Sequence, residues 1–317
     1  MAATVPPTTG PPTTGSRATK GPLRPTRGRT AALVIGVPVC LALIGSAGLS
    51  LLASFAEGTY PVSYTAPATT RALTLNVDGK LTIRPAAAGP ATLTGTARYA
   101  FVRAALTEHT AGTDTTVGPY HCPIPFGNCE FDATATVPAT ITTLTATSGS
   151  GDATVTGTAG PVKLSTGDGN LSVSHASGPL TLNTASGNIQ VSAVKSATLS
   201  ASSGNGDIRA TGITSATIAA NTDSGSIDES GVTATTLTAS SGNGGIEIAF
   251  TGAPPRNVRV NTDSGNITLL LPPGSTRYHV TANTDSGSVD DRLPRNTSSG
   301  NVITATSGDG NITLLQQ

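Results

Sequence analysis

The feature that most constrains the fold of this 317-residue chain is a short pattern that recurs nine times after residue 139. Each copy is anchored on a glycine, and successive anchors are 18 to 23 residues apart. An aliphatic residue stands seven positions before every anchor, a serine or threonine three before it, and an aliphatic residue or alanine two after it. The anchors are Gly151, Gly169, Gly187, Gly206, Gly225, Gly244, Gly265, Gly287 and Gly310. Nine copies in one register indicate a repeat protein in which each copy is one structural unit.

Each copy predicts two short strands, because apolar residues recur with period two on both sides of the anchor. Every copy reads in the same direction, so like strands are expected to stack in parallel into an all-β fold, a β-solenoid whose coils rest on their neighbours. Alanine five positions before the anchor in six copies indicates a narrow interior. We expect the anchor glycine to supply a positive φ, and the hydroxyls to bond the corner backbone as a Ser/Thr ladder. A two-sheet β-roll or sandwich is the alternative.

Two further segments precede the repeats. Residues 1–30 are rich in Pro, Thr and Gly and carry five basic residues and no acidic one, which predicts a disordered tail. Residues 31–55 carry no charge and are long enough to cross a bilayer as a transmembrane helix. The basic residues before this segment place the tail in the cytoplasm and the repeats outside the membrane. The alternative is a signal peptide cleaved near Ala56.

Residues 56–138 are less regular, and we expect a cap and an irregular β region ahead of the repeats at 139–317. Residues 73–83 predict a strand, a tight turn and a second strand, which would form an opening coil or a cap. Outside the membrane, Cys122 and Cys129 are predicted to form a small disulfide loop. The alternative is a metal site that includes the adjacent His121, but it would need more cysteine or histidine ligands.

Composition and motifs exclude several functions. The net charge is zero and only 11% of residues are charged, so nothing indicates nucleic-acid binding. The sequence contains no nucleotide-binding loop, metalloprotease motif or nucleophile elbow, and it predicts no catalytic residue, metal or cofactor. One outward row is distinctive, since Arg209, Asp228 and Glu247 stand three positions after successive anchors. Such a row fits either a sugar-binding groove or a cross-strand salt-bridge ladder.

A second distinctive feature is an acidic position in the turns. The sequence Asn-Thr-Asp-Ser-Gly occurs three times and places Asp223, Asp263 and Asp285 at one turn position. Because Asp263 and Asp285 belong to copies that follow each other in the sequence, we expect them to stack about one strand spacing apart. A cation between the two carboxylates is one interpretation, and a solvated acidic edge is the other.

The segments Val137–Pro138 and 144–152, with the later copies of the latter, resemble the bacterial DUF4097 β-strand repeat proteins, a family of candidate adhesins. The resemblance covers about residues 73–314 and is weaker before Val137. It implies a β-repeat fold and supplies no catalytic residue. A membrane anchor before the repeats is common in this family.

The chain is therefore predicted to be a single-pass membrane protein whose repeats form an extracytoplasmic rod. We expect a non-catalytic adhesin or envelope scaffold whose partner is a cell-wall polysaccharide or a surface protein. One alternative is a β-helix enzyme that acts on polysaccharides, which would need a groove lined by clustered charged and aromatic side chains. Another alternative is an accessory protein of the envelope-stress response.

Overall fold

The computed structural model describes residues 57–100, 103, 105–121 and 130–317. The predicted transmembrane helix at 31–55 and both Cys122 and Cys129 lie outside these ranges. All regular elements of the described ranges are strands, and they include no helix of the length and apolarity needed to span a bilayer.

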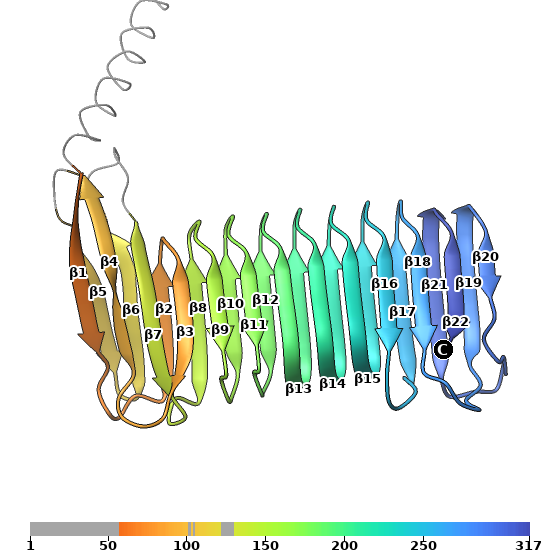
Figure 1. Ribbon diagram of the computed structural model, residues 1–317, viewed down its shortest axis with the longest axis horizontal. Coiled ribbons are helices and arrows are strands. Elements are labelled where there is room, and N and C mark those ends of the chain that lie inside the picture. The colour runs from red at the N-terminus through yellow and green to blue at the C-terminus, as the bar shows by residue number, and fades with distance from the viewer. Residues whose placement is uncertain (1–56, 101–102, 104, 122–129) are drawn as a thin grey trace, which may run out of the picture. The chain divides into compact units, whose positions relative to one another are not determined.

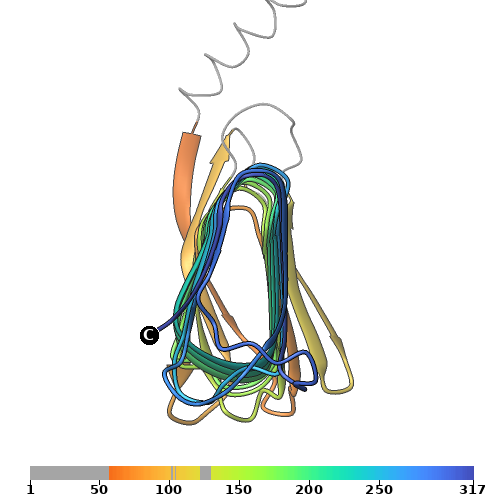
Figure 2. The same cartoon turned by 90° about the vertical axis from the view of Figure 1, so that its right-hand side faces the viewer.

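The repeats stack as parallel coils, as the sequence predicts, so the fold of this part is a β-solenoid (Figures 1 and 2). Each coil gives one strand to each of two faces. The first face contains β2 (Ala72–Val77), β8 (Thr143–Ser148), β10 (Val162–Thr166), β12 (Leu180–Thr184), β17 (Asn257–Thr262), β21 (Val302–Asp309) and β19 (His279–Ser286). The second contains β3 (Leu81–Ala86), β9 (Ala153–Thr156), β11 (Leu171–Ser174), β16 (Ile246–Phe250), β18 (Ile267–Leu271), β22 (Ile312–Gln316) and β20 (Val289–Asp291).

Three long strands join the two faces in the middle of the stack. They are β13 (Ile189–Ser203), β14 (Ile208–Thr222) and β15 (Ile227–Ser241), and each runs around one corner of the coil. The segment at 73–83 forms β2 and β3, which pair in parallel with β8 and β9 and so form a coil in front of the nine repeats. β6 (Asp114–His121) and β7 (Phe131–Pro138) continue the stack, because they pair in parallel with β2 and β3. Antiparallel strands then cover that end: β4 (Thr92–Ala100) pairs with β7 and with β1 (Glu57–Thr65), and β5 (Ala105–Ala111) pairs with β6.

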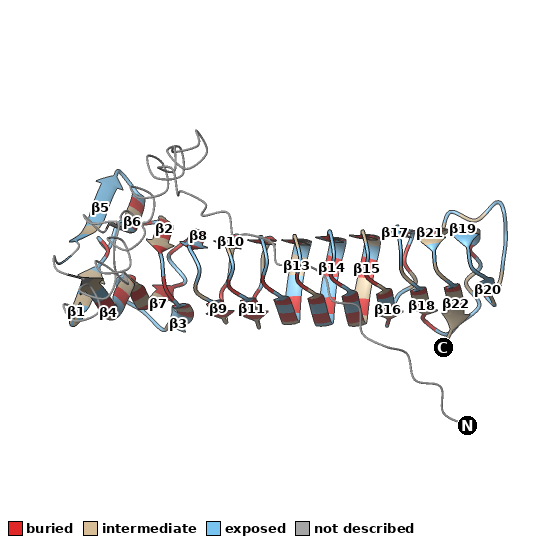
Figure 3. Ribbon diagram, turned by 90° about the horizontal axis from the view of Figure 1, so that it is seen from above, coloured by how far each residue is buried: buried red, intermediate tan, exposed pale blue. Residues whose placement is uncertain are grey.

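The predicted inward positions form continuous interior rows. Ile208 pairs in register with Ile227, Ile227 with Ile246, and Ile246 with Ile267. Each of these four side chains is at most 2% exposed, whereas Asp228, one residue after Ile227, is exposed. Figure 3 shows the result as buried stripes that alternate along β13, β14 and β15. The period-two reading of the repeat is confirmed.

The buried hydroxyls three positions before the anchors form the predicted Ser/Thr ladder. Thr184 Oγ1 donates a hydrogen bond to the carbonyl oxygen of Gly169 in the preceding coil, 3.1 Å away. The same oxygen accepts a hydrogen bond from the N–H of Gly187 in its own coil at 3.0 Å. Ser203, Thr222 and Ser241 repeat both contacts. Each buried hydroxyl is thereby satisfied and ties one coil to the next.

The expected role of the anchor glycines is wrong in one respect. Of the nine anchors, Gly287 alone has a φ in the left-handed region. A Cβ atom at Gly225 would overlap the carbonyl oxygen of Gly206, and the other stacked anchors are equally close to the coil beside them. Glycine is therefore required at these turns because two backbones approach closely, and not because the turn needs a positive φ.

Positive φ occurs instead at the opposite corner, six residues after the anchor. Gly157, Gly212 and Gly231 have φ values of 66°, 65° and 64° there. In two coils this position holds His175 (φ 53°) and Ala193 (φ 51°), where a side chain has to adopt a left-handed conformation. This conformation is costly for a residue with a Cβ atom.

The last three coils are not in sequence order. β17 pairs with β21 and not with β19, and β18 pairs with β22 and not with β20. The coil formed by β21 and β22 therefore lies between the coil of β17 and β18 and the coil of β19 and β20. The expectation that every coil rests on its sequence neighbours is wrong at this end, because coils with equivalent edges can pair in either order.

Candidate functional site

The outward row three positions after the anchors lies on the second face. Arg209, Asp228 and Glu247 are in register on adjacent coils, as the sequence predicts. However, Arg209 forms its ion pair with Asp207, two residues earlier on its own coil, with 3.6 Å between Nη2 and Oδ2. The row is therefore not a cross-strand salt-bridge ladder. The ion pair between Arg209 and Asp207 is also too exposed to contribute much stability.

A groove of about 330 Å³ lies on the same face, close to the anchor turns. Its walls come from three successive coils, and six of its eight lining residues are polar: Asn170, Leu171, Ser172, Asn188, Ile189, Gln190, Asp207 and Arg209. Ser172, Gln190 and Arg209 pair in register across β11, β13 and β14, so they follow one another at about 4.8 Å, the strand spacing. The groove thus offers a hydroxyl, an amide and a guanidinium in a straight row.

A ladder of hydrogen bonds from side-chain amide and carboxylate oxygens links the groove residues of successive coils. Asn170 Oδ1 accepts a hydrogen bond from the backbone N–H of Asn188 at 2.9 Å, and Asn188 Oδ1 accepts one from Asp207 at 2.8 Å. Asp207 Oδ1 in turn accepts from the N–H of Ser226 at 2.9 Å. By contrast, no described residue hydrogen-bonds the amide of Gln190, which leaves its donors and acceptor available for a ligand.

The acidic turn positions are arranged differently from the sequence prediction. Asp223, Asp263 and Asp285 are all exposed. Because the coil of β21 and β22 is inserted, Gly308 lies between Asp263 and Asp285. In the same way, the pairing registers place Gly242 between Asp223 and Asp263. The carboxylates alternate with glycines at a spacing of about 10 Å, two coils apart. At this distance water and salt screen the repulsion, so no bridging cation is needed.

One buried carboxyl, that of Glu229 on β15, is not among the site residues predicted from the sequence. It lies in an interior row, paired in register with Ala210 on one side and Ile248 on the other, and it is 1% exposed. Its Oε2 has no hydrogen-bond partner among the described residues. Burial, with a smaller contribution from the neighbouring charge of Asp228, raises the pKa of Glu229 to about 7. The signal was present in the sequence, because Glu229 stands where most copies carry an aliphatic residue or alanine.

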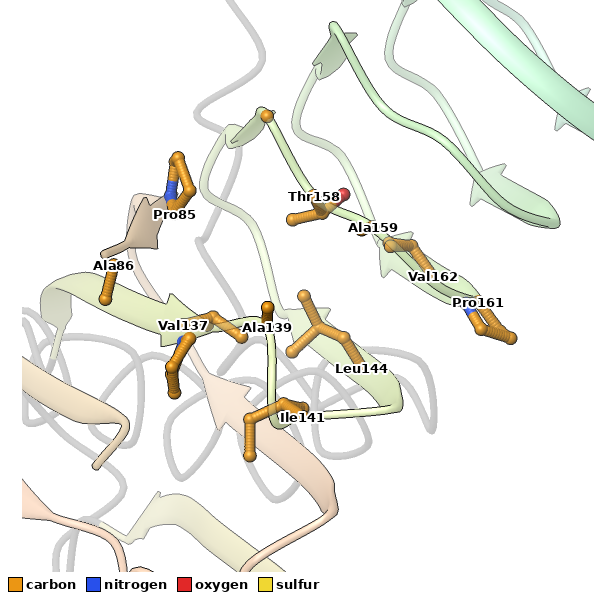
Figure 4. Close-up of a pocket in the computed structure, with 12 residues that line it drawn as sticks. Pro85, Ala86, Val137, Ala139, Ile141, Leu144, Thr158, Ala159, Pro161 and Val162 are labelled. Atoms are coloured by element: carbon orange, nitrogen blue, oxygen red, sulfur yellow. The ribbon is translucent and has the colours of Figure 1, made fainter. Parts of the chain in front are cut away.

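A smaller, apolar cavity of about 80 Å³ lies at the corner between the end of β3, the segment that joins β7 to β8, and residues 157–162. Val137, Leu144, Thr158 and Val162 surround it (Figure 4). Thr158 begins a corner row that continues through Ala176, Val194, Ile213 and Val232. Because this row begins with small side chains, the corner is incompletely filled at this end. Thr158 Oγ1 is buried and has no hydrogen-bond partner in the described part of the chain.

Two further site predictions concern the cysteine pair and metal binding. The predicted disulfide between Cys122 and Cys129 lies outside the described residues. Within the described ranges, no group of three or more His, Cys, Asp or Glu side chains is arranged to hold a metal ion.

Comparison with known proteins identifies a family. A model of the Toastrack DUF4097 family matches residues 135–315. No curated protein matches the sequence.

The chain is also similar to three solved structures. A candidate adhesin of Bacteroides fragilis is 14% identical, with a TM-score of 0.45, over 82% of this chain and 97% of its own. A candidate lipid-binding protein of Parabacteroides distasonis is 15% identical, with a TM-score of 0.48, over 82% and 96%. A candidate cell adhesion protein of Clostridium sporogenes is 12% identical, with a TM-score of 0.27, over 82% and 100%.

Proposed function

The chain belongs to the Toastrack DUF4097 family, and we propose that it is a membrane-anchored, non-catalytic surface rod that acts as an adhesin or envelope scaffold. In this proposal residues 31–55 span the membrane, the tail is cytoplasmic and the coils are extracytoplasmic. The partner is a polar polymer, and a cell-wall polysaccharide fits best.

The observation that carries the proposal is the groove on the second face. Its row of Ser172, Gln190 and Arg209 repeats along the rod at about the strand spacing, which is close to the length of one sugar unit in an extended glycan. Hydroxyl, amide and guanidinium groups are suited to hydrogen bonds with sugar hydroxyls, and the hydrogen-bond ladder two residues earlier on each coil helps to preorganise the row. A rigid row loses little conformational entropy when it binds.

The same face supports a binding role more than a hydrolytic one. Asp228 and Glu247 are on adjacent coils and approach the separation that a retaining glycosidase uses. A glycosidase, however, keeps its acid in an enclosed, apolar environment that holds the carboxyl protonated. Both of these carboxylates are exposed on an outward face, and we therefore favour binding without bond cleavage.

Binding of the purified full-length chain in detergent to an array of bacterial cell-wall glycans tests this proposal. Gln190→Ala and Arg209→Ala should each weaken binding by about tenfold, since each removes one or two hydrogen bonds to the ligand. Lys163→Ala is the matched control, because it also removes an exposed charge but lies on the opposite face. Equal loss with Lys163→Ala would mean non-specific charge attraction, and shortening of the glycan would establish the hydrolase instead.

Topology is tested separately. Protease added to intact cells should digest the coils and spare a tag attached to Met1. A mature extracytoplasmic amino terminus at Glu57 would contradict a retained anchor.

A further inference from the structure

Three strands of the first face have an arginine just before them and an aspartate at their far end. The pairs are Arg71 and Asp78 around β2, Arg256 and Asp263 around β17, and Arg277 and Asp285 around β19. A strand of this face runs from the opposite corner to the anchor turn and so crosses the whole width of the rod. The two charges of each pair therefore lie on opposite edges of the rod and at the same level along its axis.

The two edges differ in charge over the last three coils. The anchor edge, which the turns around the anchor glycines form, carries the exposed carboxylates Asp263, Asp309 and Asp285 on three successive coils. The corner edge, which the opposite corners form, carries the exposed guanidinium groups of Arg256 and Arg277. Figure 2 looks along the stack and shows that the two edges lie on opposite sides of the cross-section.

The six paired charges have no ionic partner within the chain. All six side chains are exposed, and none forms an ion pair with another described residue. Two other arginines of the end coil, by contrast, are ion-paired with carboxylates of their own coil. The pair around β2 has charged neighbours, since Lys80 follows Asp78 by two residues and Asp114 lies on the strand beside Arg71. The pairs around β17 and β19 are therefore expected to contribute more.

We propose that copies of this chain associate side by side, parallel and level, so that the acidic anchor edge of one rod lies against the basic corner edge of the next. A copy displaced sideways by one rod width brings three pairs together: Asp78 and the partner's Arg71, Asp263 and the partner's Arg256, and Asp285 and the partner's Arg277. Each rod in such a contact keeps one free acidic edge and one free basic edge. The contact therefore repeats, and it produces rows of rods and not a closed dimer.

The spacing of the charges is the reason to infer a second copy and not an unrelated protein. β8, β10, β12, β13, β14 and β15 lie between β2 and β17, so seven strand spacings, about 34 Å, separate the first two pairs. β21 lies between β17 and β19, so the last two pairs are about 10 Å apart. The same spacing occurs on both edges, and a second copy matches it without any adjustment.

Several pairs on two rigid edges act together, although a single exposed ion pair contributes little. If the chain is anchored as proposed above, neighbouring copies also share one direction and a high effective concentration in the membrane, which favours parallel contacts. The association does not depend on glycan binding, because the three pairs do not include a residue that lines the groove.

Sedimentation velocity of the purified full-length chain in detergent, at low ionic strength and over a range of concentrations, tests the proposal. Species larger than a dimer should form as the concentration rises and dissociate in about 1 M salt, where the Debye length is about 3 Å. Arg256→Glu with Arg277→Glu makes both edges acidic, and Asp263→Arg with Asp285→Arg makes both edges basic. Each double variant alone should associate at least tenfold more weakly, because like charges then meet.

An equal mixture of the two double variants should associate again, because the unchanged basic edge of one meets the unchanged acidic edge of the other. Lys163→Glu with Arg259→Glu is the matched control, since it reverses two exposed positive charges on the outward side of the first face and should leave association unchanged. Melting monitored by circular dichroism establishes that all variants fold.

Four outcomes would overturn the inference: a chain that is monomeric at all concentrations in low salt, association that stops at a dimer, equal weakening by the control variant, and a mixture that does not associate. Gln190→Ala, in the groove, should leave association unchanged. Loss of glycan binding in the array and loss of association are therefore distinguishable results.

Discussion

The middle of the rod and its end coil contain the same sequence and bury it differently. Asn-Thr-Asp-Ser-Gly occurs at 221–225 in the middle and at 283–287 at the end. Thr222 is buried but its counterpart Thr284 is only partly so, and Ile227 is 1% exposed where Val289 is 41% exposed. The sequence of a coil decides which side chains point inward, but burial requires a coil on either side.

Two carboxylates at equivalent positions also differ between the middle of the stack and its end coil. Four residues after the anchor, Glu229 points into the closed middle and has no hydrogen bond to its Oε2 from the described residues. Asp291 occupies this position in the end coil, where it pairs with Arg295 and accepts a hydrogen bond from the N–H of Leu293 at 2.9 Å. An open end admits a partner for an inward carboxylate, and a closed stack does not.

The largest expected effect is that of an aspartate placed in the closed interior. Ile227→Asp would bury an unpaired charge between Ile208 and Ile246, and we expect it to lower the free energy of unfolding by about 4 kcal/mol or more. Val289→Asp, at the equivalent position of the end coil, should cost less than about 1 kcal/mol. Urea denaturation followed by circular dichroism measures both.

Asp228→Ala is the control for that comparison, because it changes the adjacent outward residue and should alter stability by less than about 0.5 kcal/mol. If Ile227→Asp and Val289→Asp destabilise the chain equally, the distinction between a closed middle and an open end is wrong.

The next effect is a pH dependence that originates in the middle of the rod. Folding raises the pKa of Glu229 from 4.5 to about 7, mainly by burial, so the native state retains a proton that the unfolded chain releases. The contribution of this bound proton to the free energy of unfolding is therefore complete below pH 4.5. It is lost as the pH rises to about 7, which lowers the free energy of unfolding by about 3 kcal/mol in total. Glu229→Gln should remove this slope from the stability profile between pH 5 and 8.

Glu247→Gln provides the matched control, since its carboxylate is exposed in the next coil and stays in water in both states. The wild-type slope should persist in this variant. A Glu229→Gln profile that keeps the wild-type slope would show that another group is responsible.

A somewhat smaller effect concerns the contact between coils at the anchor turns. Gly225→Ala would force a Cβ atom against the carbonyl oxygen of Gly206, and separating the two backbones should cost about 2–3 kcal/mol. Gly300→Ala is the matched change near the end coil, where a Cβ atom would meet no atom within 4 Å. Similar melting temperatures for the two variants would contradict the close-approach explanation.

The smallest expected effect is at the opposite corner. Ala193→Gly should stabilise the chain by about 1 kcal/mol, because the residue has a φ of 51° that glycine adopts without strain. Gly212→Ala makes the reverse change at the equivalent position of the next coil, where φ is 65°, and should destabilise by a similar amount. Thermal melting of both variants measures the difference, and a change of the same sign in both would exclude this account.

Much of the regular stack was predictable from the sequence. The alternation around each anchor is enough to identify Ile208 and Ile227 as interior residues and Asp228 as outward, since side chains in a strand alternate between its two sides. The hydroxyl ladder was predictable because a buried serine or threonine in every copy needs a repeated hydrogen-bond partner. The need for glycine at the anchors was also visible, but its cause was not, because a close approach involves the backbone of another coil.

The polar groove was likewise predictable from the sequence only in part. Arg209, Asp228 and Glu247 were identifiable as one outward row, but the amide ladder that holds Asn170 and Asn188 became visible only when the coils were stacked. Glu229 breaks the apolar pattern in the sequence, yet its raised pKa depends on the neighbours Ala210 and Ile248, which belong to different coils.

By itself the sequence determined the coil: its two strands, its inward and outward faces and the residue types at its corners. These are local properties that follow from backbone geometry within about twenty residues. The order of the last three coils was decided only by the tertiary structure. β17 offers the same inward pattern and the same backbone edge to β19 and to β21, so the repeat carries no information about which one pairs with it. That choice depends on the connections at 272–278 and 292–301 and on the contacts they make across the end of the stack, and it places Asp263 and Asp285 two coils apart.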